Sequence, residues 1–293
     1  MVYSPSTAAP PGDGDANAPQ HVHTYRQQGF AIVRGVFAPL EIAALADAFD
    51  RIRAEGMRHP KSFRHGNVFF RVAVDPAIGR ILRYMQWPGY IDPVLDRFRT
   101  DPRMLNLVAP LIGSNLKQII NQMHWKPPGA AIAEFGWHQD IRFRRPREAY
   151  RRPGDSYVQT GIAVDRHRAE SGAMRILPCS HRFGELALGD GRVMDRPLDD
   201  SDLRRVGLDP AAAVTLELDP GDVALGHLYT LHGSGPNRSP ADRRFYINGY
   251  VDAAMCDRGE PTFDEGHPVP LGAPVLVHWE DLHVRPEPHY VEQ

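Results

Sequence analysis

The stretch KQIINQMHWKPPG (residues 117–129) joins a β-rich run to a Pro-Pro-Gly turn. Short β-rich runs separated by Pro/Gly turns continue as far as residue 251, and no run of apolar residues at helical spacing interrupts them. Further predicted strands cover residues 157–164, 174–177, 214–218, 223–225 and 245–251. Short strands with regular turn signals are typical of an all-β sandwich or barrel, so we predict a mainly β fold.

The N-terminal third of the chain supplies the helices of this fold. Residues 29–33 (GFAIV) predict a short strand, and Pro39 then begins a helix that Gly56 ends. A second helix is predicted over residues 102–113. Both helices are amphipathic, so each needs a partner surface. In the first helix the apolar positions are Ile42, Leu45, Phe49 and Ile52.

Composition limits the classes of function. The 293 residues are 42% hydrophobic and 24% charged, with a formal net charge of −2, so nothing indicates a nucleic-acid partner. No apolar run approaches membrane-spanning length, and we expect no membrane partner. Cys179 and Cys256 are predicted to be reduced thiols, and the protein to be cytoplasmic. We expect a monomer or a homodimer. Residues 1–20 predict a disordered tail, and residues 21–293 a single domain whose Pro-rich end, from Arg258 onward, wraps the surface.

One triplet carries potential metal ligands. In Trp137-His138-Gln139-Asp140, residues two apart project to the same face of a strand. His138 and Asp140 would then offer an imidazole nitrogen and a carboxylate oxygen to one point. Alone, an H-x-D triplet is weak, because it also occurs by chance on surface strands.

A second segment completes the constellation. His232 opens the run HGSGPN (residues 232–237), and Arg243 follows eleven positions after the histidine. Two histidines and one carboxylate on one side of a ferrous ion form a facial triad, which leaves positions for a chelating co-substrate and dioxygen. A fixed guanidinium is the natural bidentate partner for a distal carboxylate of such a co-substrate.

These ordered motifs resemble the phytanoyl-CoA dioxygenase family of iron(II)/2-oxoglutarate-dependent oxygenases, over about residues 24–255. The family's H-x-D appears at residues 138–140, its distal H-G-S-G-x-N at 232–237, and Arg243 follows at the usual interval. Its P-G-S-H appears at residues 178–181, with Cys179 in place of the usual Gly. The resemblance implies a double-stranded β-helix of the jelly-roll, cupin-like kind, with the N-terminal helices packed on one sheet.

The resemblance also implies a reaction and its residues. His138, Asp140 and His232 would hold Fe(II), and Arg243 would bind the C5 carboxylate of 2-oxoglutarate. O2 and 2-oxoglutarate would be consumed, with release of succinate and CO2 and oxidation, most often hydroxylation, of a small-molecule substrate. Because related halogenases lack the carboxylate ligand, Asp140 argues against halogenation. Further contacts to 2-oxoglutarate are expected from Gln122, Ser234 and Arg71.

Several residues compete for these roles. His227 lies five positions before His232, an odd offset that would put it on the opposite face of a continuous strand. Arg244 competes with Arg243 and does not fit the family interval. We therefore expect His227 to be a packed or surface histidine, and Arg244 to point away. His124 is expected in a hydrogen-bonded structural role, and His181 as a cap of its own turn.

The segment 142–152 holds six arginines and follows the H-x-D triplet directly. It is either a lid that meets an anionic substrate or a solvated loop. Two other classes of function also stay open: a cupin-type metalloenzyme that uses the same triad without 2-oxoglutarate, and a non-catalytic β-barrel that binds a small molecule. Arg243 argues against the first and the intact triad against the second.

Overall fold

The computed structural model describes residues 18–186, 199–274 and 287–291. The predicted disordered tail, residues 1–20, therefore lies almost entirely outside the described residues. Helix α1 (Gln20–Gln28) begins at the last residue of that prediction. No helix within the described ranges is long and apolar enough to cross a membrane.

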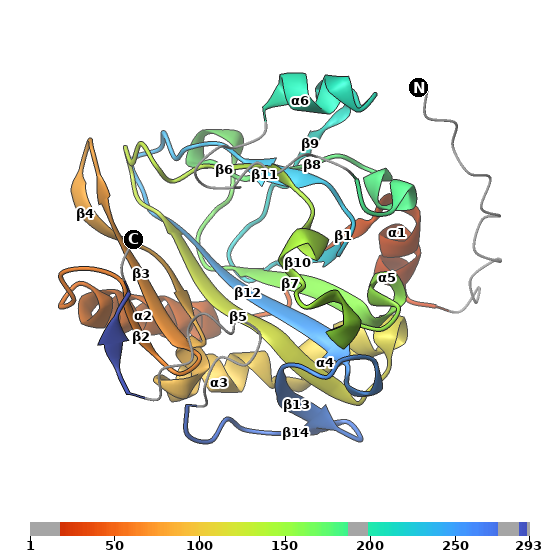
Figure 1. The fold of residues 1–293 in the computed structure, drawn as a ribbon, viewed down its shortest axis with the longest axis horizontal. Helices are drawn as coiled ribbons and strands as arrows, with labels where there is room; N and C mark the ends of the chain where they lie inside the picture. Colours follow the sequence, from red (N-terminus) through yellow and green to blue (C-terminus); the bar gives the residue numbers. More distant parts are fainter. Residues whose placement is uncertain (1–17, 187–198, 275–286, 292–293) are drawn as a thin grey trace.

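The β-rich region forms the double-stranded β-helix that the resemblance implied. From residue 116 onward the chain crosses repeatedly between two antiparallel sheets (Figure 1). The small sheet has the order β6-β11-β8-β9, and the centre of the large sheet has the order β10-β7-β12-β5. The large sheet takes β5 (Leu116–Lys126), β7 (Tyr157–Ala163), β10 (Val223–His227) and β12 (Arg243–Asp252). The small sheet takes β6 (Phe135–His138), β8 (Met174–Ile176), β9 (Val214–Thr215) and β11 (His232–Ser234).

The large sheet extends beyond this core at both edges. At one edge β1 (Phe30–Val33) pairs with β10, as expected for the GFAIV run. At the other edge β4 (Gly79–Gln86), β3 (Val68–Asp75), β2 (Phe63–His65) and β15 (His289–Tyr290) follow β5 in that order. Strands β2, β3 and β4 were not predicted, because arginines interrupt their apolar alternation. These arginines are Arg64, Arg71, Arg80 and Arg83.

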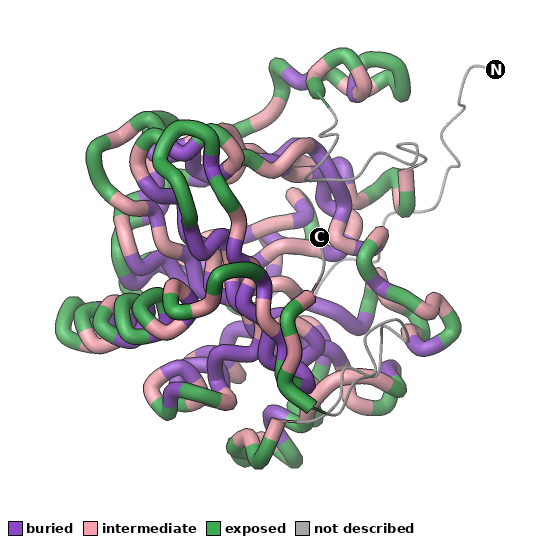
Figure 2. The backbone as a smooth tube through the Cα atoms, turned by 60° about the vertical axis from the view of Figure 1, so that its left-hand side comes forward, coloured by how far each residue is buried: buried purple, intermediate pink, exposed green. Residues whose placement is uncertain are grey.

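Helices cover the outer face of the large sheet. Helices α2 (Pro39–Gly56), α3 (Pro93–Arg99) and α4 (Pro102–Ile112) lie on the side away from the small sheet (Figure 1). The apolar stripe of α2 is buried there: the ring of Phe49 lies 4.9 Å from that of Trp125 on β5. The strands between the helices and the small sheet are mostly buried, whereas the outer sides of the helices are exposed (Figure 2). Two short helices, α5 (Pro153–Ser156) and α6 (Asp200–Arg205), lie in connections.

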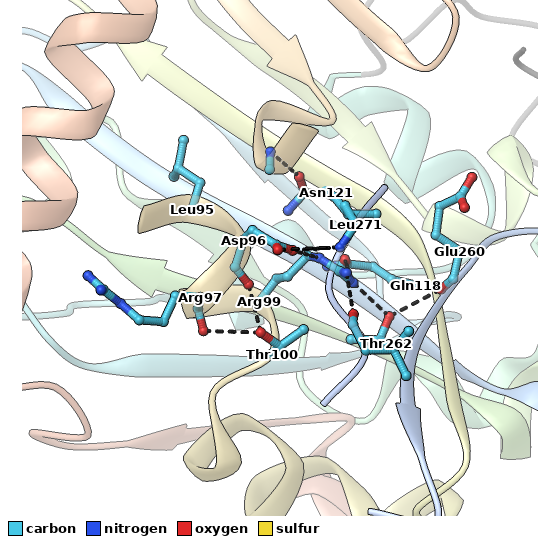
Figure 3. Close-up of polar contacts among 12 residues, drawn as sticks. Leu95, Asp96, Arg97, Arg99, Thr100, Gln118, Asn121, Glu260, Thr262 and Leu271 are labelled. Atoms are coloured by element: carbon cyan, nitrogen blue, oxygen red, sulfur yellow. Dashed lines mark hydrogen bonds and ion pairs between the residues drawn. The ribbon is translucent and has the colours of Figure 1, made fainter. Parts of the chain in front are cut away.

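A buried arginine ties the C-terminal segment to this face. Strand β13 (Glu260–Asp264) pairs with β5 and turns into β14 (His267–Pro268). The fully buried guanidinium of Arg99, on α3, contacts Asp96 at 2.6 Å, the Thr262 hydroxyl at 3.1 Å and the Val269 carbonyl at 2.7 Å (Figure 3). A buried charge is tolerated when its donors are all partnered, so this cluster fixes residues 260–271 against the sheet.

Candidate metal centre and co-substrate pocket

Three side chains converge between the two sheets. Strands β6 and β11 are antiparallel neighbours, and their register sets His138 directly opposite His232. The two imidazole rings are 4.2 Å apart. The Oδ1 atom of Asp140 lies 3.8 Å from Nε2 of His138 and 3.9 Å from Nε2 of His232. One ligand atom from each residue lies within 4.8 Å of the other two, a spacing that a single metal ion can span.

Backbone carbonyls orient both imidazoles. Nδ1 of His138 is 2.7 Å from the carbonyl oxygen of Gly136, and Nδ1 of His232 is 3.0 Å from that of Thr230. If each Nδ1–H donates to its carbonyl, the Nε2 lone pairs face Asp140, as in metal-bound histidines. Burial, and then the neighbouring His232, lower the pKa of His138 to about 3. His138 is therefore neutral at pH 7, which is the form that a metal requires.

Asp140 reaches the centre in a slightly different way from the prediction. Strand β6 ends at His138, and Asp140 is the first residue of a 3-10 helix rather than part of the strand. The side chains of His138 and Asp140 still project to the same side, because Gln139 between them is extended, at φ −112° and ψ 138°. The buried Gln139 side chain points away and donates to the carbonyls of Gly184 and Tyr229 at 2.8 and 2.6 Å. Gln139, which sequence reasoning left without a role, thus holds the neighbouring loops to the ligand strand.

Arg243 lies at the start of β12, in register with Lys126 on β5. Its guanidinium is buried and donates at 3.0 Å to the carbonyl of Gly172, while Nε has no partner among the described residues. Burial lowers the pKa of Arg243 to about 10. The Ser234 hydroxyl, expected as a further contact to 2-oxoglutarate, accepts from Nζ of Lys126 at 2.6 Å. This second buried basic side chain next to Arg243 was not recognised from the sequence, in which Lys126 only precedes a turn.

The other expected contacts line the same pocket. Gln122 and His124 project from β5, and the Gln122 side-chain oxygen lies 2.9 Å from Nε2 of His124. His124 also stacks on Tyr84, at 5.6 Å, so its expected hydrogen-bonded packing role agrees with this geometry. Arg71, on β3, lines the pocket, and the described part of the chain gives it no ion pair.

Arg244 and His227, the alternatives to Arg243 and His232, make contacts of their own. Arg244 points away from the pocket and forms a two-point contact with Asp165, at 2.9 Å through both Nε and Nη2. His227 is separated from His232 by a turn, so the continuous strand assumed for the pair does not exist. Its ring lines the pocket wall and packs 5.0 Å from that of His181. His181 was predicted to cap its own turn. In the structure its Nε2 lies instead 3.2 Å from the Arg26 carbonyl on α1.

The six arginines of residues 142–152 divide into two groups. Arg147, Arg151 and Arg152 form ion pairs on the outside, with Glu185, Asp257 and Asp155 respectively. The other three line the pocket: Arg142, Arg144 and Arg145. The segment is therefore neither wholly a solvated loop nor wholly a cationic lid.

Two matched motif positions have structural roles. Cys179, which replaces the family's Gly, has φ +63°, a left-handed conformation in which glycine is favoured. The buried Asn237 donates at 2.7 Å to the carbonyls of Lys126 and Ala241. This amide bridges the end of β5 and the loop before β12, where the side chains of Lys126 and Arg243 lie close together.

The pocket encloses about 830 Å³ between the two sheets. Its walls combine apolar side chains with five arginines, whereas Asp140 is the one carboxylate among its described lining residues. The apolar lining includes Tyr84, Ile120, Phe135, Phe143, Ile176 and Ile247.

Comparison with known proteins agrees with this architecture. A model of the phytanoyl-CoA dioxygenase (PhyH) family matches residues 25–245. A probable alpha-ketoglutarate-dependent hypophosphite dioxygenase of Stutzerimonas stutzeri is 30% identical over 183 residues, 59% of this chain and 58% of that protein's length. The ectoine dioxygenase of Bordetella bronchiseptica is 22% identical over 78% of this chain and 73% of its own length. The solved structure of EctD from S. alaskensis with bound Fe superposes with a TM-score of 0.66, at 19% identity, over 88% of this chain and 86% of that one.

Proposed function

The chain belongs to the phytanoyl-CoA dioxygenase family, and from this premise we propose that it is an iron(II)- and 2-oxoglutarate-dependent dioxygenase. His138, Asp140 and His232 are the proposed metal ligands, and Arg243 the proposed partner of the C5 carboxylate of 2-oxoglutarate. Gln122, Ser234 and Arg71 are proposed as further contacts to the co-substrate. The convergence of two imidazoles and one carboxylate within 4.8 Å is the observation that carries the proposal.

The donor set suits ferrous iron. Two neutral nitrogens and one carboxylate oxygen on one side of an ion match the facial triad of non-haem Fe(II) oxygenases and leave the opposite side open. Iron with 2-oxoglutarate supplies the oxidising chemistry: dioxygen is consumed, 2-oxoglutarate becomes succinate and CO2, and a substrate C–H bond is oxidised, with hydroxylation the default outcome. The Asp140 carboxylate contributes the negative charge that the two imidazoles lack.

The distal site suits a dicarboxylate co-substrate. A buried guanidinium with an unpartnered Nε is unfavourable unless an anion completes its hydrogen bonds. Lys126, whose pKa burial and then Arg243 lower well below its usual value, lies at the same end of β12 and, through its bond to Ser234, fixes that hydroxyl beside the pocket. This arrangement disfavours a cupin-type enzyme that works without 2-oxoglutarate, because such an enzyme would have no use for the buried charge.

The substrate is proposed to be an anionic small molecule. The pocket is much larger than a five-carbon diacid needs, and three of its arginines remain when Arg243 and Arg71 are assigned to 2-oxoglutarate. Asp140, the one carboxylate of its described lining, is assigned to the metal. The substrate side of the pocket is therefore cationic, which favours a negatively charged group on the molecule that enters. A cytoplasmic location remains part of the proposal, supported by the two free thiols of Cys179 and Cys256.

A spectroscopic titration tests the proposal. Anaerobic addition of Fe(II) and 2-oxoglutarate is expected to give a visible 2-oxoglutarate–iron charge-transfer band, and admission of O2 should release succinate. His232→Ala is expected to remove both signals, and the matched variant His227→Ala to keep them. A wild-type protein that binds iron without the band would favour the enzyme without 2-oxoglutarate, and one that binds no iron would favour a binding protein.

A further inference from the structure

A second buried guanidinium lies in the pocket without a carboxylate partner. Arg144 is only 4% exposed and lines the pocket, yet no ion pair joins it to any described residue. Its Nη2 donates at 3.1 Å to the hydroxyl of Tyr157, and its Nε has no partner. Burial raises the pKa of Tyr157, so the tyrosine is a neutral partner. Arg144 is thus a desolvated cation that forms no direct ion pair with a described carboxylate, although Tyr157 and the charge of Asp140 help to keep its pKa raised despite burial.

The same arrangement fixes the position of Arg144. The Tyr157 hydroxyl donates to the side-chain oxygen of Gln159, so its own proton is used and its lone pair faces the guanidinium. This hydroxyl lies over Gly249 on β12, where an added Cβ would come within 2.3 Å of it. A glycine at this position is needed for the hydroxyl to sit against the strand. Arg144 is therefore held in place by a tyrosine packed on the sheet.

This site is separate from the one proposed for 2-oxoglutarate. Arg243 and Gly249 lie on the same strand, six residues apart, which corresponds to about 20 Å of extended chain. A five-carbon diacid is no longer than two extended residues, about 7 Å. Arg243 and the Tyr157–Arg144 pair therefore lie against different parts of β12, and saturation with 2-oxoglutarate is used below to keep the two sites apart. Ile120, paired with Gly249 in the adjacent strand, and Phe143 add apolar lining near the Arg144 end.

We propose that Arg144 is the anchor for an oxyanion of the substrate, a carboxylate or a phosphoryl group on an apolar body. The role as a substrate anchor rests on the proposed function. The planar fork of the guanidinium can form a two-point contact with either anion, with Tyr157 as its positioning residue. Arg142 and Arg145 line the same pocket, and Arg145 donates to the Arg144 carbonyl at 3.2 Å. Binding of the anion at this end would direct the apolar body of the substrate along the pocket toward the metal centre.

Calorimetry with three probes tests the proposal. Benzoate, phenyl phosphate and benzamide are titrated into the anaerobic protein loaded with Fe(II) and saturating 2-oxoglutarate, so that Arg243 is already occupied. We expect wild type to bind one of the two anions at least tenfold more tightly than the neutral amide. Tighter binding of benzoate would assign a carboxylate, and tighter binding of phenyl phosphate a phosphoryl group. Wild type that does not prefer either anion to benzamide overturns the proposal.

Matched variants locate the site. Arg144→Met should weaken binding of the preferred anion about 30-fold or more, and Arg144→Lys should recover part of the loss. Arg152→Met is the control, because Arg152 belongs to the same segment but is exposed and paired with Asp155. An Arg144→Met variant that binds the anion as wild type does, or a control that loses it equally, contradicts the proposal.

Two further readouts keep the test independent of folding and of the proposed function. Because Arg144 forms no direct ion pair with a described residue, Arg144→Met should unfold in urea at close to the wild-type concentration. A purely structural arginine would give a lower midpoint. The charge-transfer band is recorded before each titration: loss of the band in wild type refutes the proposed function, whereas the Arg144 dependence of anion binding decides the present inference alone.

Discussion

Replacement of Arg243 by Ala should weaken 2-oxoglutarate binding and leave iron binding nearly unchanged. The guanidinium is already buried in the free protein, and burial alone lowers its pKa to about 10. The free energy of desolvating Arg243 therefore opposes folding and not the binding of 2-oxoglutarate. The co-substrate meets a guanidinium that is already in position. Truncation of one partner of a buried charge pair costs about 2–5 kcal/mol. Since about 1.4 kcal/mol is tenfold, the apparent 2-oxoglutarate dissociation constant should rise about 30-fold or more.

The assay is an anaerobic titration of the charge-transfer band with 2-oxoglutarate, with iron content measured in parallel. Arg243→Lys should recover only part of the affinity, because an ammonium keeps the charge without the planar fork. Arg244→Ala is the control: its guanidinium pairs with Asp165 on the other side of the strand, so this variant should lose stability rather than co-substrate affinity. Unchanged 2-oxoglutarate affinity in Arg243→Ala would refute the reasoning. It would transfer the role to another cation, first Arg71 and then Lys126.

Three other perturbations have defined outcomes. Asp140→Ala should abolish oxygenation and weaken iron binding, measured as succinate release and bound iron; full activity in this variant would exclude the triad. Burial, and then His181, lower the pKa of His227 to about 4. Between pH about 6.5 and 4, the unfolded chain therefore binds a proton at His227 that the native state does not bind. Stability should therefore fall from pH 6.5 to 4, and His227→Gln should remove about 3 kcal/mol of that fall in urea unfolding. An identical pH profile for variant and wild type would contradict this. Arg99→Leu should destabilise the fold by about 3–5 kcal/mol, because it removes the ion-pair partner of Asp96 and leaves buried acceptors such as the Val269 carbonyl without their donor. The exposed neighbour Arg97→Leu should change stability by less than about 0.5 kcal/mol. Equal effects would show that the Arg99 cluster does not hold the C-terminal segment.

The predictable part of the fold is the part with strong local signals. Residues 117–125 and 245–251 lie inside β5 and β12, because β-rich runs bounded by turns leave little choice of structure. The edge strands β2, β3 and β4 carry arginines, of which Arg71 lines the pocket, so their apolar pattern is broken. Their identity as strands depends on pairing with one another and, through β4, with β5, and no local pattern contains these contacts.

The candidate site divides in the same way. The spacing of His138 and Asp140 follows from strand geometry, whereas His232 and Arg243 were assigned from the resemblance to the family's motifs. The structure brings the first three together. Lys126 and Arg144 have no such motif. Their roles depend on the register of β5 against β12 and on the packing of Tyr157 over Gly249, which link residues more than a hundred positions apart in the first case and about ninety in the second. A basic run shows that arginines are present, but only the fold shows which of them are buried.

The most direct test of the account is a crystal structure of the protein with Fe(II) and 2-oxoglutarate, prepared without oxygen. We predict one iron bound by Nε2 of His138, a carboxylate oxygen of Asp140 and Nε2 of His232, with the C5 carboxylate of 2-oxoglutarate on Arg243. Iron bound through His227 or His124, or a 2-oxoglutarate whose distal carboxylate lies away from Arg243, would contradict the central claim.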